Sequence, residues 1–119
     1  MQNLMAVAVF PDIAPDNLDR FKQVAEEMLD SVTEMDCVLR YEMFFTIDNR
    51  SCVVLEEYES PAGVIEHVQR NVKALGELSM LGGQIQGSMF PLSSDGPEIA
   101  LIRETWDSKM HTYFNGKRS

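Results

Sequence analysis

The sequence predicts a small α+β domain in which two helices pack against one antiparallel sheet. Three observations lead to this prediction. Residues 4–10 form an almost wholly apolar run, residues 16–32 place apolar side chains three and four positions apart, and residues 38–59 contain two strand-like segments around a polar turn. In chain order the predicted elements are β-α-β-β-α-β followed by an extension, which is the split-βαβ or ferredoxin-like arrangement.

The first strand and the first helix are the clearest elements. The run of residues 4–10 ends at Pro11 and is apolar enough to be buried on both faces of a sheet. Pro15 suits the first turn of the helix that follows, because its missing N–H is not needed there. The apolar stripe of this helix comprises Leu18, Phe21, Val24, Ala25, Met28, Leu29 and Val32.

Residues 38–59 predict a β-hairpin. Residues 38–47 alternate between two faces, residues 48–51 are a polar turn, and residues 52–59 form the second strand. Cys37 and Cys52 then lie at opposite ends of the hairpin, too far apart for a disulfide. We therefore expect both cysteines to be reduced thiols.

A second helix is predicted to begin at Pro61 and to end by Gly82-Gly83, with a fourth strand over residues 84–92. Residues 98–103 are a candidate fifth strand. In the tail, Trp106 and His111 are expected either to dock it on the domain or to close a pocket. We take residues 1–119 as one domain with a core of about residues 4–92 and a C-terminal extension over residues 93–119.

Composition and charge narrow the range of partners. A length of 119 residues suits one domain. The net charge of −9 disfavours binding to phosphate backbones, so no nucleic-acid partner is expected. No apolar run approaches the roughly 18 residues of a membrane span, and the chain opens without a basic leader. We therefore expect a cytoplasmic protein without a membrane partner.

The predicted sheet has two apolar faces, but the two helices can cover only one of them. The first two strands carry apolar side chains toward both sides. Left uncovered, the second face would be a large apolar patch, which soluble proteins avoid. The pattern therefore predicts a homodimer in which the sheets of two chains face each other.

The hairpin and the helix after it resemble the antibiotic biosynthesis monooxygenase (ABM) family, whose members are dimeric α+β barrels. The resemblance covers roughly residues 4–92, with Asp36 in place of the usual glycine before the cysteine. It is carried by the strand segments Cys37-Val38-Leu39-Arg40-Tyr41-Glu42 and Val53-Val54-Leu55-Glu56-Glu57-Tyr58, and by Ala62 and His67.

The resemblance implies a small-molecule enzyme that uses O2 without metal, flavin or other cofactor to oxidise an aromatic or polyketide-like molecule. His67 would be the base or a hydrogen-bond partner, and Tyr58 would be the second catalytic residue. Arg40 would stabilise the developing oxyanion. The residues expected to bind the substrate are Arg40, Glu56, Tyr41 and Asn71.

The residues themselves leave alternatives open. Glu56 and Tyr58 share one face of their strand, and Arg40 shares a face of the neighbouring strand with Glu42. These groups either line a ligand cavity or form a structural ion pair, and the sequence does not fix which carboxylate meets Arg40. His67 is either a pocket residue or a half-buried histidine bonded within the fold.

The function is equally open at this level. Besides a monooxygenase, the resembling fold accommodates isomerases and haem-degrading oxygenases. A non-catalytic, dimeric small-molecule-binding module is the remaining alternative, because a fold does not by itself determine a function.

Overall fold

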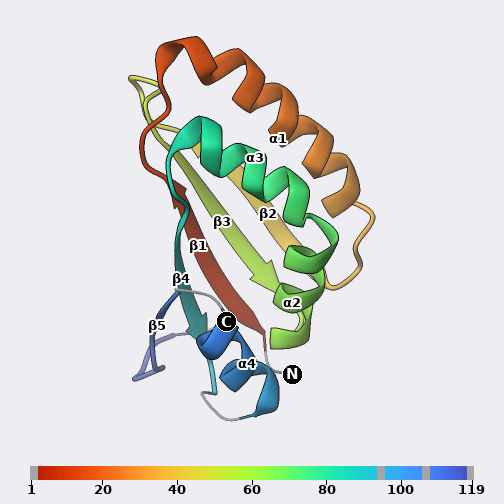
Figure 1. Ribbon diagram of the computed structural model, residues 1–119. Coiled ribbons are helices and arrows are strands. Elements are labelled where there is room, and N and C mark those ends of the chain that lie inside the picture. Colours follow the sequence, from red (N-terminus) through yellow and green to blue (C-terminus); the bar gives the residue numbers. More distant parts are fainter. Residues whose placement is uncertain (1–2, 94–95, 106–107, 118–119) are drawn as a thin grey trace.

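The computed structural model describes residues 3–93, 96–105 and 108–117, and it contains one five-stranded sheet (Figure 1). The strand order is β2-β3-β1-β4-β5. All neighbouring strands are antiparallel except β4 and β5, which are parallel. The strands are β1 (Leu4–Phe10), β2 (Val38–Phe45), β3 (Cys52–Tyr58), β4 (Gln86–Pro91) and β5 (Lys109–Met110).

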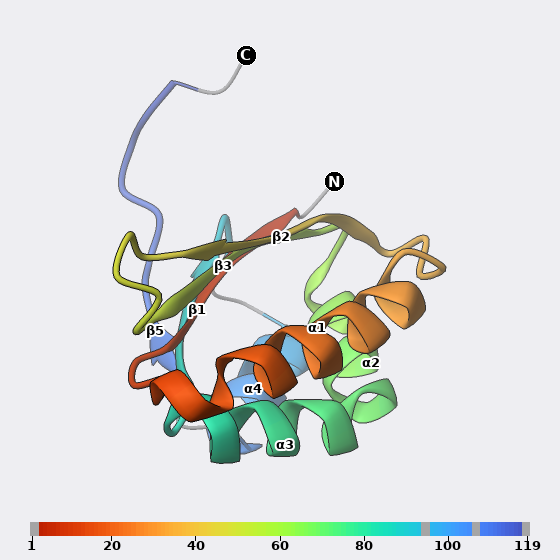
Figure 2. The ribbon, with the colours of Figure 1, turned by 90° about the horizontal axis from the view of Figure 1, so that it is seen from above.

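The helices lie together on one side of this sheet and leave the other side uncovered (Figure 2). A 3-10 turn, η1 (Pro15–Asn17), leads into the first helix. The α-helices are α1 (Leu18–Val32), α2 (Pro61–Arg70), α3 (Val72–Gly82) and α4 (Pro97–Thr105). None of the helices in the described ranges is long and apolar enough to cross a membrane.

The predicted fold class and the order of its first six elements are confirmed. The hairpin register pairs Phe45 with Cys52 and Val38 with Tyr58, which places Cys37 and Cys52 at opposite ends, and both thiols are free. The predicted second helix is divided into α2 and α3 by Asn71, whose backbone (φ −116°, ψ 21°) departs from the helical region.

The candidate fifth strand over residues 98–103 is wrong, because this segment is part of α4. Ile99 and Ile102 are both buried, and their spacing of three is helical rather than alternating. Pro97 at the start of the helix suits its first turn. In the tail, the His111 ring stacks on Phe90 with 4.3 Å between centroids. Trp106 lies outside the described residues.

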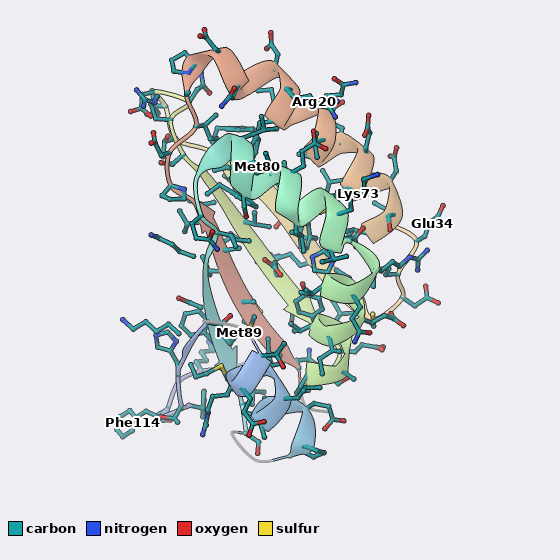
Figure 3. The ribbon with its side chains drawn as sticks, viewed as in Figure 1. Arg20, Glu34, Lys73, Met80, Met89 and Phe114 are labelled. Carbon is teal, nitrogen blue, oxygen red and sulfur yellow. The ribbon has the colours of Figure 1, made fainter. Side chains whose placement is uncertain are left out.

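The apolar core consists of two clusters on the helix side of the sheet. In the first cluster, Phe21 of α1 makes edge-to-face contacts with Phe10 and Phe45, with centroid distances of 5.2 and 6.0 Å. The second cluster lies at the other end of the sheet and joins Tyr58 and Met89 to buried side chains of α2 and α4. Figure 3 shows Met89 on β4 beside α4. The two clusters bracket the region that holds the candidate site.

Part of the uncovered face of the sheet, near the turn between β2 and β3, is apolar across three strands. Phe44, Val53 and Val9 are directly paired across β2, β3 and β1, so they share this face. Phe44 is 51% exposed, and the two valines are half-buried. Residues 111–117 extend from the sheet edge away from the helices and leave the face open (Figure 2).

Candidate functional site

A cavity of about 360 Å³ lies between the sheet and helices α2 and α3. Its size is at the lower end of the range for small-molecule sites. Small residues on adjacent strands create the space, because Ala6 and Ala8 face the helices from β1 and Gly87 is paired with Ala8 on β4. Larger side chains at these positions would fill the cavity.

Glu56 is the only carboxyl group among the described residues that line the cavity. It lies in the middle of β3, opposite Tyr41 of β2 and Ala6 of β1, and it is 6% exposed. The Tyr58 hydroxyl, two residues along the same face of β3, donates a hydrogen bond to Glu56 Oε1. The carboxyl is thus buried beside a phenol, and none of the ion pairs between Arg and carboxylate side chains in the described part of the chain involves it.

Burial dominates the protonation of this pair. Removal from water raises the pKa of Glu56 from 4.5 to about 7, and the Tyr58 hydrogen bond offsets only part of that rise. The pKa of Tyr58 is raised by burial and then by the neighbouring Glu56, so its hydroxyl stays protonated and remains a donor. Glu56 can therefore gain or lose a proton near neutral pH.

His67 reaches the same cavity from α2. A close approach of this helix to β3 positions it, since a Cβ on Gly63 would lie 3.2 Å from the Tyr58 ring and 3.3 Å from the Cys37 carbonyl oxygen. One helical turn later, the imidazole is 2% exposed and lies between two phenol rings. Its centroid is 4.9 Å from that of Tyr41 and 6.1 Å from that of Tyr58.

Asn71 determines which nitrogen of His67 carries the proton. The Asn71 side-chain nitrogen lies 3.0 Å from His67 Nδ1 and donates to the His67 carbonyl oxygen at 3.1 Å. An amide nitrogen can only donate, so Nδ1 accepts and Nε2 bears the hydrogen. Burial lowers the pKa of His67 to about 4, which keeps the ring neutral at pH 7. His67 is therefore a hydrogen-bond donor rather than a strong base.

Tyr41 supplies the second phenol of the site. It points from β2 toward the helices and lines the cavity beside Glu56 and His67. Burial raises the pKa of Tyr41, and the Glu56 carboxyl raises it further. Its hydroxyl is consequently a neutral polar group in a mostly apolar wall.

Five of the six residues predicted for the site come together, and Arg40 does not. Tyr41, Glu56, Tyr58 and His67 line the cavity, while Asn71 contacts His67. Arg40 lies on the opposite face of β2, where its Nε is 3.0 Å from Glu42 Oε1 and both side chains are about half exposed. Within this chain it cannot stabilise an oxyanion in the cavity.

Sequence reasoning missed the small residues that create the space of the cavity and several polar residues that line it. Ala6 and Ala8 occupy buried positions of β1 between the large residues Leu4 and Phe10. Two small residues at inward positions of this strand could have predicted a cavity beside it. Ser79, Gln84 and Ser108 also line the cavity, and no local motif marked them. Sequence reasoning also treated Glu56 only as a binding group and did not foresee that burial raises its pKa to about 7.

The site combines a carboxyl that titrates near neutrality with three neutral donors in an apolar enclosure. Such a site can move a proton to or from a small molecule and hold the resulting charge by hydrogen bonds. Within residues 3–93, 96–105 and 108–117, no group of three or more His, Cys, Asp or Glu side chains is arranged to hold a metal ion.

Solved structures with the same architecture were found by comparison of the fold. MupZ from Pseudomonas fluorescens matches with a TM-score of 0.83 at 14% identity, over 100% of this chain and 96% of MupZ. Rv0793 from Mycobacterium tuberculosis matches with a TM-score of 0.65 at 17% identity, over 73% of this chain and 91% of Rv0793. A structure named antibiotic biosynthesis monooxygenase matches with a TM-score of 0.63 at 17% identity, over 78% of this chain and 99% of that structure.

The chain has the fold of the antibiotic biosynthesis monooxygenases. No protein-family model matches the sequence, and no curated protein sequence matches it. The match to MupZ takes in the segment after β4, including α4 and β5, so this extension of the monooxygenase fold is not unique to the present chain.

The buried carboxyl makes a testable contribution to stability. Because its pKa is raised from 4.5 to about 7, the folded protein keeps a proton that the unfolded chain releases between these pH values. The free energy of unfolding of the wild type, relative to Glu56→Gln, should fall by about 3 kcal/mol as pH rises through this window and then level off. Urea denaturation near pH 5 and near pH 8 measures it.

His67 has the opposite pH dependence, because its lowered pKa makes the folded state lose stability as pH falls from about 6.5 toward 4. This contribution is present in both proteins and cancels in the comparison with Glu56→Gln. A difference between wild type and Glu56→Gln that stays constant across the pH window would show that Glu56 titrates normally.

Proposed function

We propose that this protein is a cofactor-independent monooxygenase acting on a small, electron-rich molecule with an acidic C–H or phenolic O–H. The observation that carries the proposal is the cavity in which Glu56, with a pKa of about 7, meets Tyr58, Tyr41 and His67. The monooxygenase names of several structures with this fold give further support.

In the proposed reaction Glu56 is the base. Its carboxylate removes a proton from the substrate, and a hydrogen bond from His67 Nε2 holds the oxygen on which negative charge develops. The single O–H of Tyr58 is bonded to Glu56 and holds the carboxylate in place. This assignment moves the role of base from His67, whose ring is neutral and whose Nδ1 is occupied by Asn71. Tyr41 orients the substrate ring.

The electrons come from the substrate. The substrate anion reduces O2; one oxygen atom then enters the product as a carbonyl, and the other leaves as water with the two hydrogens of the oxidised carbon. An apolar wall favours this step because it excludes water from the anion. The haem alternative is less well supported, since haem carries two propionates and the described lining residues include no Lys or Arg.

Isomerisation is the second candidate. A carboxyl with a pKa near 7 can take a proton from one carbon and return it to another at neutral pH. This function needs the same cavity and the same base but consumes no oxygen. Oxygen uptake therefore separates the two candidates, and the absence of any turnover leaves the non-catalytic binding module.

Replacement of the base tests the proposal. With a panel of anthrones and quinols, Glu56→Gln should lose about 100-fold or more in kcat/KM for oxygen consumption, because no group of suitable pKa remains to take the proton. In the wild type, kcat/KM should rise with pH around a midpoint near 7 as Glu56 deprotonates. An oxygen electrode measures both.

Glu57→Gln is the matched control, because Glu57 is the next residue of β3 and does not line the cavity. It should keep wild-type activity. The monooxygenase proposal fails if Glu56→Gln retains full activity, or if the substrate is converted without oxygen uptake.

We also propose that two chains pair through the uncovered face of the sheet. The paired residues Phe44, Val53 and Val9 form an apolar surface there, and Phe90 adds a ring that is 39% exposed. Apolar faces of this kind are typical of subunit interfaces. The tail carries Phe114, which is 96% exposed and lies away from the body of the chain (Figure 3).

Light scattering tests the dimer. The wild type should have twice the 13.5 kDa mass of the chain at micromolar concentration. Phe44→Asp should shift it toward monomer because a charge would be buried in the interface. Met80→Asp, at an 85% exposed position on the helix side, should leave the mass unchanged. A monomeric wild type would contradict the proposal.

A further inference from the structure

One stripe of α3 forms the outer wall of the cavity. The stripe consists of Val72, Leu75, Gly76 and Ser79, whose spacing of three and four places them on one side of the helix. Leu78 of α3 belongs to the first core cluster and does not line the cavity, whereas Leu75 contacts both the cluster and the cavity. Val72 is 63% exposed although it lines the cavity, so the cavity reaches the surface beside α3.

Gly76 is the gap in this wall. It lies in the interior of α3, where glycine is less favourable to a helix than alanine. Packing does not explain its presence, because an added Cβ would meet nothing within 4 Å. Gly82 differs, since a Cβ there would lie 2.7 Å from the Phe21 ring. The missing side chain at position 76 therefore leaves open space at the rim of the cavity.

The cavity changes in character from its closed end to this rim. The closed end carries Glu56 with its two tyrosines and His67, while Val68, Val72 and Leu75 make the wall toward α3 apolar. Among the described lining residues there is no Lys or Arg that would neutralise a negative group. An anionic ligand would lose its hydration in the cavity, where the only charged partner among the described residues is the Glu56 carboxyl. Binding of an anion is therefore unfavourable.

We infer that the site takes a neutral, apolar molecule that enters past Gly76, and that the absence of a side chain at position 76 determines how bulky this molecule can be. The inference rests on the proposed function only in using the same cavity. It adds the charge and the apolar character of the ligand, and a residue that limits its size.

A pair of fluorescent probes tests the ligand class. N-phenyl-1-naphthylamine is neutral, and 1-anilinonaphthalene-8-sulfonate has the same rings with an added sulfonate. The wild-type protein should bind the neutral probe at least about tenfold more tightly than the sulfonate, because the sulfonate has no cation to meet in the cavity. Equal or tighter binding of the sulfonate would overturn the inference on charge.

Substitutions on α3 test the entrance. Gly76→Leu should weaken binding of the neutral probe about tenfold or more by filling the rim. Gly76→Ala should raise the melting temperature, because alanine favours the helix, and should weaken binding less than leucine does. Lys73→Leu is the matched control, since Lys73 is exposed on α3 and does not line the cavity (Figure 3). It should bind as the wild type does.

The inference is overturned if Gly76→Leu binds the neutral probe as well as the wild type, or if Lys73→Leu weakens binding equally. A melting temperature and circular dichroism spectrum like those of the wild type ensure that a loss of binding is local. Probe binding requires no turnover, so the two proposals can fail separately. If the protein shows no oxygenase activity but Gly76→Leu still weakens binding of the neutral probe, the proposed function is contradicted and this inference stands.

Discussion

The burial of the Glu56 carboxyl beside the Tyr58 hydroxyl is the constraint on which the site depends. A carboxylate removed from water is costly without a cation, and the shift of its pKa to about 7 corresponds to about 3 kcal/mol. The same shift makes the group useful, because a carboxyl with this pKa exchanges protons at neutral pH. The two phenols and the neutral imidazole around it then act as donors rather than as competing bases.

The fold supplies the rigid support that this arrangement needs. Glu56 and Tyr58 are fixed by β3, which is paired on both sides by β2 and β1, and Gly63 lets α2 approach closely enough to place His67 beside them. Small residues on β1 and β4 keep the adjacent space empty, although the core clusters on either side are densely filled. The cavity therefore lies between the two clusters of the apolar core and reaches the surface beside α3.

Periodicity in the sequence was sufficient to predict the first four strands and α1, and it placed Glu56 with Tyr58 on one face. It could not place Arg40, because β2 carries mixed side chains on both faces and the hairpin register that aligns Tyr41 with Glu56 is a tertiary property. The segment over residues 98–103 was too short for its apolar run to distinguish strand from helix. The boundary between α2 and α3 at Asn71 could not be predicted, because no Pro or Gly marks it in the sequence. This boundary nevertheless positions the Asn71 amide that contacts His67 Nδ1.

The most direct test of this account is the titration of the Glu56 carboxyl itself. Carbon-13 NMR of the side-chain carboxyl carbons, with Glu56→Gln used to assign the resonance, gives its pKa in the folded protein. The account predicts a midpoint near 7, well above the ordinary 4.5. A midpoint at the ordinary value would mean that water or a cation reaches Glu56, and it would remove the basis for proton transfer in this cavity.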